Sequence, residues 1–498
     1  MLRKLLTIFI LVLAYFILYR IYMARVSAFG CFDDCFNIAA GYFINEGKTL
    51  YSDIFFNHQM LMPHISAYIQ HLNPINVYEL VLRHRQFVLL FGFLFNLLLF
   101  LRFGSPMIPF VITYEFTKFY LFGDRFLAEG LVVYPLVYLS SLAFHKVLKK
   151  RIFPIDYFLA SVFAWFVIFM REPFVLLAVF LLLFVYYGKF QKLKVLSFAI
   201  FIVLSSTTLL LAPLNEYFQN VVVMNSIIFK GDLQLLSLLK SFLYPFQVVL
   251  SNEKNPFMLI LIPISLAFIL YAFNLVKDRK YALFIAMFVI LGLANFRNTE
   301  PGKIFHESFH ILPWYGLIVA FTFLLIFNFA KKYFAAALVI LTSLFLLYIP
   351  RSFLVEKINS HEEFITNYGH ILETGNVFSI LKEEGDTYFA DGFDELTHWQ
   401  VDLPSPYKYS WYTSFMPRFE TYSTARLEMF RDSPPVFYYG SCPEDKNAER
   451  LIPDEYKNQY RNITREEKPT CLYVRGDKTI PEEKIRMLKQ DFNLDLKN

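Results

Sequence analysis

The sequence has few cysteines and none of the short motifs in which cysteine carries chemistry. There are four cysteines in 498 residues, with no Cys-x-x-Cys pair and no zinc-ligand spacing. No internal repeat at a fixed period and no low-complexity tract is visible, which argues against a solenoid or repeat array. The net charge of +5 is modest, and in a chain this apolar it reflects loop placement rather than affinity for nucleic acid.

Long apolar runs are what the sequence does have. The chain is 56% hydrophobic, with 59 Phe and 32 Tyr, whereas a soluble domain is usually about 45–50% apolar. Runs of about 18–20 such residues predict membrane-spanning helices. Hydropathy indicates about eleven spans, near 5–23, 85–103, 106–122, 126–144, 153–170, 173–188, 194–213, 256–275, 280–296, 311–329 and 333–349. We therefore expect a polytopic α-helical membrane protein, with 106–122 the weakest span because it contains Glu115 and Lys118.

The first run, MLRKLLTIFILVLAYFILYR, has two interpretations. Its basic start, its apolar core and the Val-Ser-Ala at 26–28 are typical of a cleaved signal peptide. The run also fits a retained span whose Arg20 extends its charged end to the far interface. The many spans that follow favour the retained helix.

The distribution of Lys and Arg predicts the orientation. With the N-terminus in the cytosol, the strongly basic short loops all fall inside: Arg102, 145–151, 188–194, 277–280 and 331–332. The outer side then receives the loop 24–84, the turn Arg171–Glu172, the loop 214–255, the segment 297–310 and the tail. The domains expected are a membrane domain over 1–350 and an extracytoplasmic domain over 351–498.

The tail predicts a small α/β domain. Short strand-like runs occur at 387–390, 436–439 and 471–474, and 418–431 has a helical pattern. All four cysteines fall on the expected outer side, so Cys442 and Cys471 are candidates for a disulfide in an oxidising compartment. Cys31 and Cys35 allow a bridge, a metal site or simple burial, and the sequence leaves these alternatives open.

Two adjacent carboxylates, Asp33 and Asp34, follow the first apolar run. The apolar residues after them, at 36, 39, 40, 43 and 44, have helical spacing, and Gly47 is a suitable stop. We expect an amphipathic helix that lies flat on the outer membrane surface, followed by a second helix that begins at Pro63. Acidic residues at a helix start are often only caps, but one cap explains one carboxylate better than two.

This stretch, FDDCFNIAAGYFINEGKTLYSDIFFNHQMLMP, resembles the GT-C superfamily of membrane glycosyltransferases. The branch in question includes protein O-mannosyltransferases and aminoarabinose transferases, whose members typically have an Asp-Glu pair after the first span. Asp33 occupies the first acidic position, and Asp34 stands where Glu is usual. Gly47, Tyr51, Asp53 and His58 also match, whereas Gln59 and Met60 replace the common Pro-Pro.

Three further stretches are similar to the same family. GDRFLAEGLVVYPLVYLSSLAF (123–144) resembles an early span opened by an acidic residue, here Glu129. FHESFHILPWYGLIVAF (305–321) resembles the His-aromatic-Leu-Pro start of a late span, and the tail stretch that ends at Trp411 resembles the outer domain of bacterial members. Each motif is short, and together they are distributed over most of the length of the chain.

The resemblance implies transfer of a sugar from a polyprenyl-phosphate donor to a glycan, lipid or protein acceptor at the outer membrane face. An inverting transfer needs one general base, for which Asp33 is the candidate, with Asp34 in a supporting role because adjacent helical residues face different ways. Asp53 and His58 are assigned to the acceptor loop. Positive or hydrogen-bonding groups should stabilise the departing phosphate; the outer-face candidates are Arg171, Arg297, Lys303, His306 and His310.

Structural explanations compete with these roles. Arg171 and Glu172 also fit a salt bridge between two helix ends, and Glu129 also fits a helix-start charge, although ionisable residues in a span are functional by default. His306 and His310, four residues apart, favour phosphate contact over a metal pair, which would need further ligands; a divalent metal stays open as a cofactor. A transporter should show inverted repeats and broken spans, and an assembly protein needs no acidic pair at the interface, so both are weaker alternatives.

Overall fold

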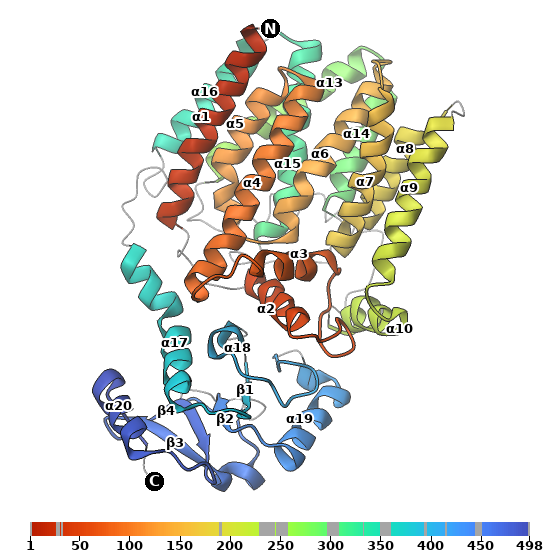
Figure 1. The fold of residues 1–498 in the computed structure, drawn as a ribbon. Helices are drawn as coiled ribbons and strands as arrows, with labels where there is room; N and C mark the ends of the chain where they lie inside the picture. Colours follow the sequence, from red (N-terminus) through yellow and green to blue (C-terminus); the bar gives the residue numbers. More distant parts are fainter. Residues whose placement is uncertain are drawn as a thin grey trace.

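The computed structural model is mostly helical, with one small sheet near the C-terminal end (Figure 1). It describes residues 2–25, 30, 33–188, 192–228, 245, 257–295, 308–331, 333–348, 360–392, 396–413, 416–443 and 451–496. Figure 1 shows three layers: a bundle of long helices, a layer of short helices at one end of the bundle, and a C-terminal domain beyond that layer. The N-terminus lies at the opposite end of the bundle from the C-terminal domain.

The bundle consists of apolar helices at the segments expected to span a membrane. They are α1 (Leu2–Arg25), α4 (Val77–Phe103), α5 (Met107–Thr117), α6 (Ala128–Val147), α7 (Pro154–Met170), α8 (Val175–Tyr186), α9 (Lys192–Leu209), α13 (Met258–Lys277), α14 (Tyr281–Leu293), α15 (Leu312–Phe329) and α16 (Tyr333–Tyr348).

Among the described residues, five segments are helical, long and apolar enough to cross a membrane by length and composition: Val77–Phe103, Ala128–Val147, Lys192–Leu209, Met258–Lys277 and Phe309–Phe329. Shorter apolar helices lie at Leu5–Ile21, Pro154–Met170, Glu172–Tyr186, Tyr281–Leu293 and Tyr333–Phe345. The helices α1, α4 and α8 also expose large side chains such as Phe9, Leu94 and Leu183. An apolar surface of this kind suits contact with hydrocarbon rather than water.

The weakest expected span, 106–122, contains a buried charge network. α5 ends at Thr117 and continues as the short η1 (Lys118–Leu121). Glu115 and Lys118 form an ion pair of 2.7 Å, and both side chains are fully buried. Tyr134 of α6 and Asn96 of α4 each donate a hydrogen bond of 2.7 Å to Glu115. Buried charges are tolerated when they are paired in this way, and the network joins α5 to two neighbouring helices.

The middle layer contains α2 (Asp33–Asn45), α3 (Leu61–Gln70), α10 (Leu214–Phe218), η3 (Gln219–Met224) and α11 (Asn225–Ile228). α2 matches the expected helix, and Gly47 follows it with φ +83°, the left-handed geometry that glycine adopts readily. α3 begins at Leu61, before Pro63. α2 packs on α3 and meets α18 (Leu396–Val401) of the C-terminal domain, so most of its residues are buried by protein.

The C-terminal domain is a small α/β unit. Its helices are α17 (Ser360–Leu381), α18 (Leu396–Val401), η5 (Met416–Arg418), α19 (Glu420–Asp432), η7 (Asp454–Gln459) and α20 (Glu482–Phe492). Its strands are β1 (Tyr388–Ala390), β2 (Phe437–Tyr439), β3 (Tyr460–Arg465), β4 (Lys468–Arg475) and β5 (Leu494–Asp495). The sheet order is β1-β2-β4-β3-β5, in which β1 and β2 are parallel and the other pairs antiparallel.

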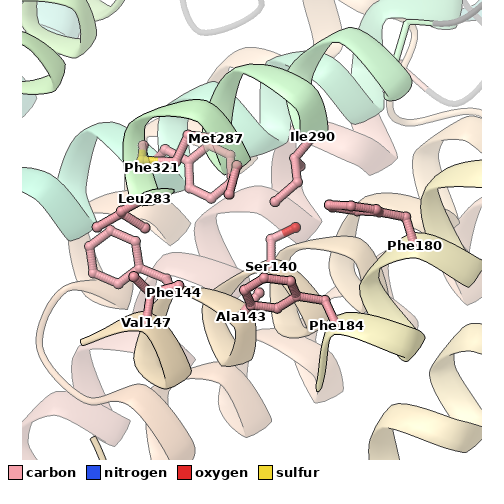
Figure 2. Close-up of a pocket in the computed structure, with 11 residues that line it drawn as sticks. Ser140, Ala143, Phe144, Val147, Phe180, Phe184, Leu283, Met287, Ile290 and Phe321 are labelled. Carbon is pink, nitrogen blue, oxygen red and sulfur yellow. The ribbon is translucent and has the colours of Figure 1, made fainter. Parts of the chain in front are cut away.

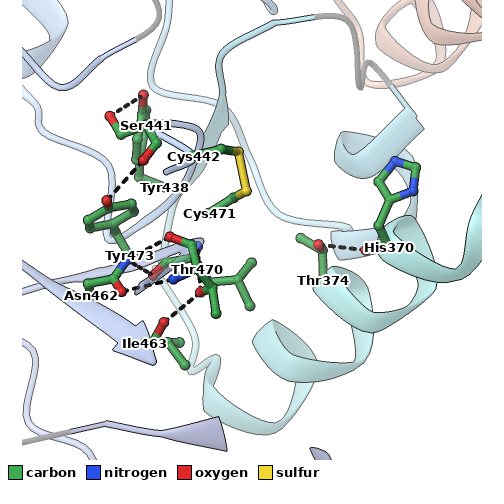
Figure 3. The surroundings of a disulfide bond; sticks show 11 residues. His370, Thr374, Tyr438, Ser441, Cys442, Asn462, Ile463, Thr470, Cys471 and Tyr473 are labelled. Atoms are coloured by element: carbon green, nitrogen blue, oxygen red, sulfur yellow. Dashed lines mark hydrogen bonds between the residues drawn. A yellow bond between two sulfur atoms is a disulfide. The ribbon is translucent and has the colours of Figure 1, made fainter. Parts of the chain in front are cut away.

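A disulfide links two neighbouring strands of this domain. Cys442, just after β2, is joined to Cys471 of β4, the pair proposed from the sequence (Figure 3). Cys35 of α2 is also disulfide-bonded, while Cys31 lies outside the described residues. Figure 3 also shows Asn462 of β3, whose side-chain amide donates to the Thr470 carbonyl at 2.8 Å across the hairpin.

Polar contacts attach the C-terminal domain to the middle layer. Lys48 Nζ donates to the Tyr407 carbonyl at 3.2 Å, between residues 359 positions apart. The Ser410 hydroxyl donates to the Asp53 carbonyl at 2.9 Å. These bonds place the domain directly over the loop that follows α2.

Candidate functional site

Asp33 lies at the first position of α2, where the middle layer meets the bundle. Its side chain is exposed, and among the described residues its carboxylate accepts no hydrogen bond. Desolvation by the surrounding protein nevertheless raises its pKa, since nearby atoms displace part of the water that would solvate the charged form. Arg171 and His58 lower this pKa, and Glu129 and Asp34 raise it. The structure therefore gathers the main sequence candidates around one solvent-accessible carboxylate.

Asp34 faces the opposite way. It is fully buried, with an oxygen 3.2 Å from Nη2 of Arg85 on α4. The same Arg85 nitrogen donates to the Gly30 carbonyl at 2.7 Å, and Arg125 donates to that carbonyl at 3.1 Å. Gly30 has φ +59° and lies against Asn367 of α17. Asp34 thus holds the start of α2 against α4 of the bundle.

Arg171 and Glu129 form a second buried pair. Arg171 ends α7, and Glu129 lies in the first turn of α6; Arg171 Nε donates to Glu129 at 2.9 Å. Both residues are less than a tenth exposed. Arg171 Nη1 is also 3.7 Å from Glu172, so one guanidinium lies between two carboxylates. The salt bridge between helix ends that the sequence left open is therefore present.

His58 completes the cluster. Its Nδ1 lies 3.0 Å from Glu172 Oε1. Its ring meets Phe56 edge-on, and it also meets Phe36, which lies one turn after Asp33 on α2. Sequence reasoning treated Glu172 only as the neighbour of Arg171, because nothing local links position 172 to position 58.

The C-terminal domain covers this part of α2. Trp411 is almost fully buried, with its ring 5.6 Å from that of Phe36 and 5.3 Å from that of Phe43. Phe36 therefore contacts both His58 and the covering domain. The sequence did not predict the contact of Trp411 with α2, although the stretch that ends at Trp411 resembles the outer domain of the family. This contact depends on packing between segments that are distant in the sequence.

The other candidates do not join the cluster. Asp53 accepts a hydrogen bond of 3.0 Å from the Thr49 amide and so stabilises its own loop. His310, in η4 (Ser308–Ile311), is buried and stacks on Phe309. Arg297, Lys303 and His306 lie outside the described residues. Within the described segments, no group of three or more His, Cys, Asp or Glu side chains is placed to hold a metal ion.

A pocket in the bundle is separate from the cluster. It is lined mainly by apolar side chains of α6, α8, α14 and α15, including Phe144, Phe184, Met287 and Phe321 (Figure 2). Its one hydroxyl, on Ser140, lies eleven positions along α6 from Glu129, which corresponds to about 16 Å along a helix axis. The pocket offers no group for proton transfer.

Comparison with known protein families, curated proteins and solved structures finds no match to this chain. The candidate site therefore rests on its own geometry: one exposed carboxylate of raised pKa, two linked acid–base pairs beside it, and an aromatic cover.

Proposed function

We propose that the chain is a glycosyltransferase of the GT-C type. It transfers a sugar from a polyprenyl-phosphate donor to an acceptor at the outer membrane face, with inversion and with Asp33 as general base. The observation that carries the proposal is the Asp33 carboxylate, open to solvent and without a hydrogen bond among the described residues, at the junction of an apolar bundle and a C-terminal domain. A lipid-linked donor lies at a membrane surface, so a base at this level can meet both substrates.

In this proposal all eleven apolar segments cross the membrane, the N-terminus is cytosolic and the C-terminal domain is extracytoplasmic. Asp33 removes the proton from the acceptor hydroxyl as that oxygen bonds to the sugar C1. The bond from C1 to the phosphate oxygen breaks on the opposite face, and the lipid phosphate leaves with the electron pair. Asp34 positions α2 through Arg85, because its carboxylate is already paired.

The structure favours a positioning role for Arg171 over phosphate binding, because Glu129 and Glu172 already balance its charge. We assign stabilisation of the departing phosphate to Arg297, Lys303 and His306 of the outer segment.

The test is transfer of radiolabelled sugar by full-length protein in nanodiscs. The donors are single sugars on undecaprenyl phosphate and dolichyl phosphate, and the acceptors come from a cell-envelope extract. We expect the wild type to transfer from at least one donor, and Asp33→Asn to lose about 10²–10⁴-fold while still binding that donor. Asp278→Asn, in the exposed turn before α14, is the matched control.

Either of two outcomes contradicts the proposal. Near-normal transfer by Asp33→Asn makes Asp33 a helix cap and moves the search for the base to Asp34 or Glu129. A wild type that binds and transfers no lipid-linked sugar favours a transporter or an assembly protein.

A further inference from the structure

His58 is held in one orientation by contacts on several sides. Tyr51 donates its hydroxyl proton to the His58 carbonyl at 2.8 Å, which fixes the backbone. The rings of Phe36 and Phe56 meet the imidazole edge-on, with centroids 6.3 and 5.9 Å away. Glu172 lies 3.0 Å from Nδ1. The backbone, the ring and one nitrogen of His58 are therefore all held by neighbouring residues.

The Glu172 contact determines which nitrogen of His58 carries the proton. A carboxylate only accepts hydrogen bonds, so Nδ1 must donate, and Nε2 is then left with a free lone pair. Arg171, 3.7 Å from Glu172, stabilises the negative charge that this arrangement needs. The His58 side chain is 22% exposed, and no described residue hydrogen-bonds to Nε2. The imidazole therefore presents a proton acceptor to solvent.

Asp33 and His58 are brought near each other by α2 and its packing. Phe36 connects them structurally, since it lies one turn after Asp33 on α2 and contacts the His58 ring. The exposed carboxylate of Asp33 and the partly exposed imidazole of His58 therefore both lie next to Phe36. Both lie beside the buried Arg171–Glu129 pair.

We propose that His58 and Glu172 form a proton-transfer dyad, in which His58 Nε2 receives the proton that Asp33 takes from the acceptor hydroxyl. This proposal rests on the glycosyltransferase function proposed above. The acceptor O–H bond breaks, and its proton moves to Asp33 as the new oxygen–C1 bond forms. Asp33 then passes the proton through a water molecule to Nε2, Glu172 stabilises the imidazolium, and the proton leaves to bulk water, so that Asp33 is again ionised for the next turnover. Glu172 is a positioning residue, because it acts through His58.

The first measurement concerns the tautomer and needs no substrate. Full-length protein with ¹⁵N-labelled histidine is studied by solid-state NMR in nanodiscs, and the His58 signals are assigned by their loss in His58→Gln. We expect the neutral imidazole to carry its proton on Nδ1 in the wild type. Glu172→Gln should lose this single tautomer, because a side-chain amide can donate as well as accept. A wild type protonated on Nε2 would overturn the dyad.

The second measurement is transfer from the donor identified with the wild type. His58→Ala should lower kcat about 10²-fold with little change in donor KM, and added imidazole should restore part of the loss. Glu172→Gln should lower kcat in the same direction and change its pH profile. His64→Ala is the matched control, since His64 bonds the Met60 carbonyl on α3 and does not contact the cluster.

The outcomes separate the two proposals. If the wild type transfers and His58→Ala keeps its kcat, the dyad is wrong and the glycosyltransferase proposal stands. If His58→Ala loses kcat but imidazole restores nothing and the Glu172→Gln pH profile is unchanged, His58 is structural and the dyad is likewise wrong. If the wild type transfers from no donor, both proposals fail.

Discussion

Two adjacent carboxylates on one helix have unlike environments. Asp33 is exposed and unpaired among the described residues, whereas Asp34 is fully buried against Arg85. Successive helical positions are about 100° apart, so the two side chains leave α2 in different directions, and that of Asp34 points toward the bundle. The sequence predicted that the two carboxylates face different ways and gave Asp34 a supporting role. It had no signal for which of them would be paired, because Arg85 lies on another helix, α4.

The buried pair should matter for stability and the exposed residue should not. Asp34→Asn leaves the Arg85 charge buried without its counter-charge, and we expect a loss of about 3 kcal/mol in unfolding free energy. Asp33→Asn should not lower that free energy, because desolvation disfavours the charged form of Asp33 in the folded protein. Thermal unfolding of both variants in the same detergent measures the contrast. Equal stability of the two variants would contradict the assignment of Asp34 as a structural anchor.

The raised pKa of Asp33 predicts a pH dependence. In the folded protein Asp33 binds a proton at a higher pH than in the unfolded chain, where 3.8 is the ordinary value. Between the pKa of Asp33 in the unfolded chain and its higher pKa in the folded protein, the folded state binds more protons than the unfolded state. The stability of the wild type relative to Asp33→Asn should therefore fall as pH rises through this window. Above the window the ionised base should be fully active, and transfer should fall on acidification before an ordinary Asp would be protonated. Measuring unfolding free energy and sugar transfer as functions of pH, for wild type and Asp33→Asn, checks both the stability and the activity prediction.

At the scale of elements, α2 and α3 approach closely at one glycine. A Cβ added to Gly41 would lie 2.6 Å from the Ser66 hydroxyl oxygen and 2.7 Å from the Ala67 amide nitrogen, a backbone atom that cannot move alone. Ser66 is itself fixed by a 2.8 Å hydrogen bond to His84 of α4. The layer that carries Asp33 therefore depends on the absence of a side chain at this position.

Gly41→Ala should separate α2 from α3. We expect a loss of about 1–3 kcal/mol in unfolding free energy from overpacking, together with weaker transfer because Asp33 moves with α2. Gly369→Ala in α17 is the control, since its nearest contact would be an ordinary 3.7 Å. That substitution should be neutral, or stabilising by up to about 1 kcal/mol through helix propensity. Unfolding in detergent distinguishes them, and a Gly41→Ala protein as stable as wild type would refute the close packing.

Most elements could be predicted because their causes are local. Apolar runs located the bundle helices, and the turn glycine Gly47 located the end of α2. The pairings could not be predicted in this way. Glu172 meets His58 because two helix ends converge, and the Glu115–Lys118 pair is stabilised by Asn96 and Tyr134 from other helices. Such contacts depend on how helices pack, which hydropathy and spacing do not record.

At the scale of the whole molecule, the C-terminal domain is part of the site. Trp411 packs on Phe36 and Phe43 of α2, and the hydrogen bond from Lys48 to Tyr407 adds a polar contact beside them. The amphipathic pattern of α2 was correctly recognised, but its partner was expected to be the membrane. An amphipathic pattern indicates only that the apolar face of a helix is buried. It does not indicate whether a bilayer or a protein domain buries that face. The domain's position requires that it share a compartment with Asp33.

If the C-terminal domain and Asp33 share a compartment, the other end of the bundle should lie on the opposite side of the membrane. In the expected topology an odd number of spans separates the exposed Lys149, in the turn after α6, from the exposed Glu455 of the C-terminal domain. A single cysteine at Glu455 should react with a membrane-impermeant maleimide on intact cells, and one at Lys149 only after permeabilisation. The described native cysteines are all in disulfides and give little background. Reaction of both positions on intact cells would mean an even number of spans between them, and the proposed site could not then lie at the outer face with the basic loops inside.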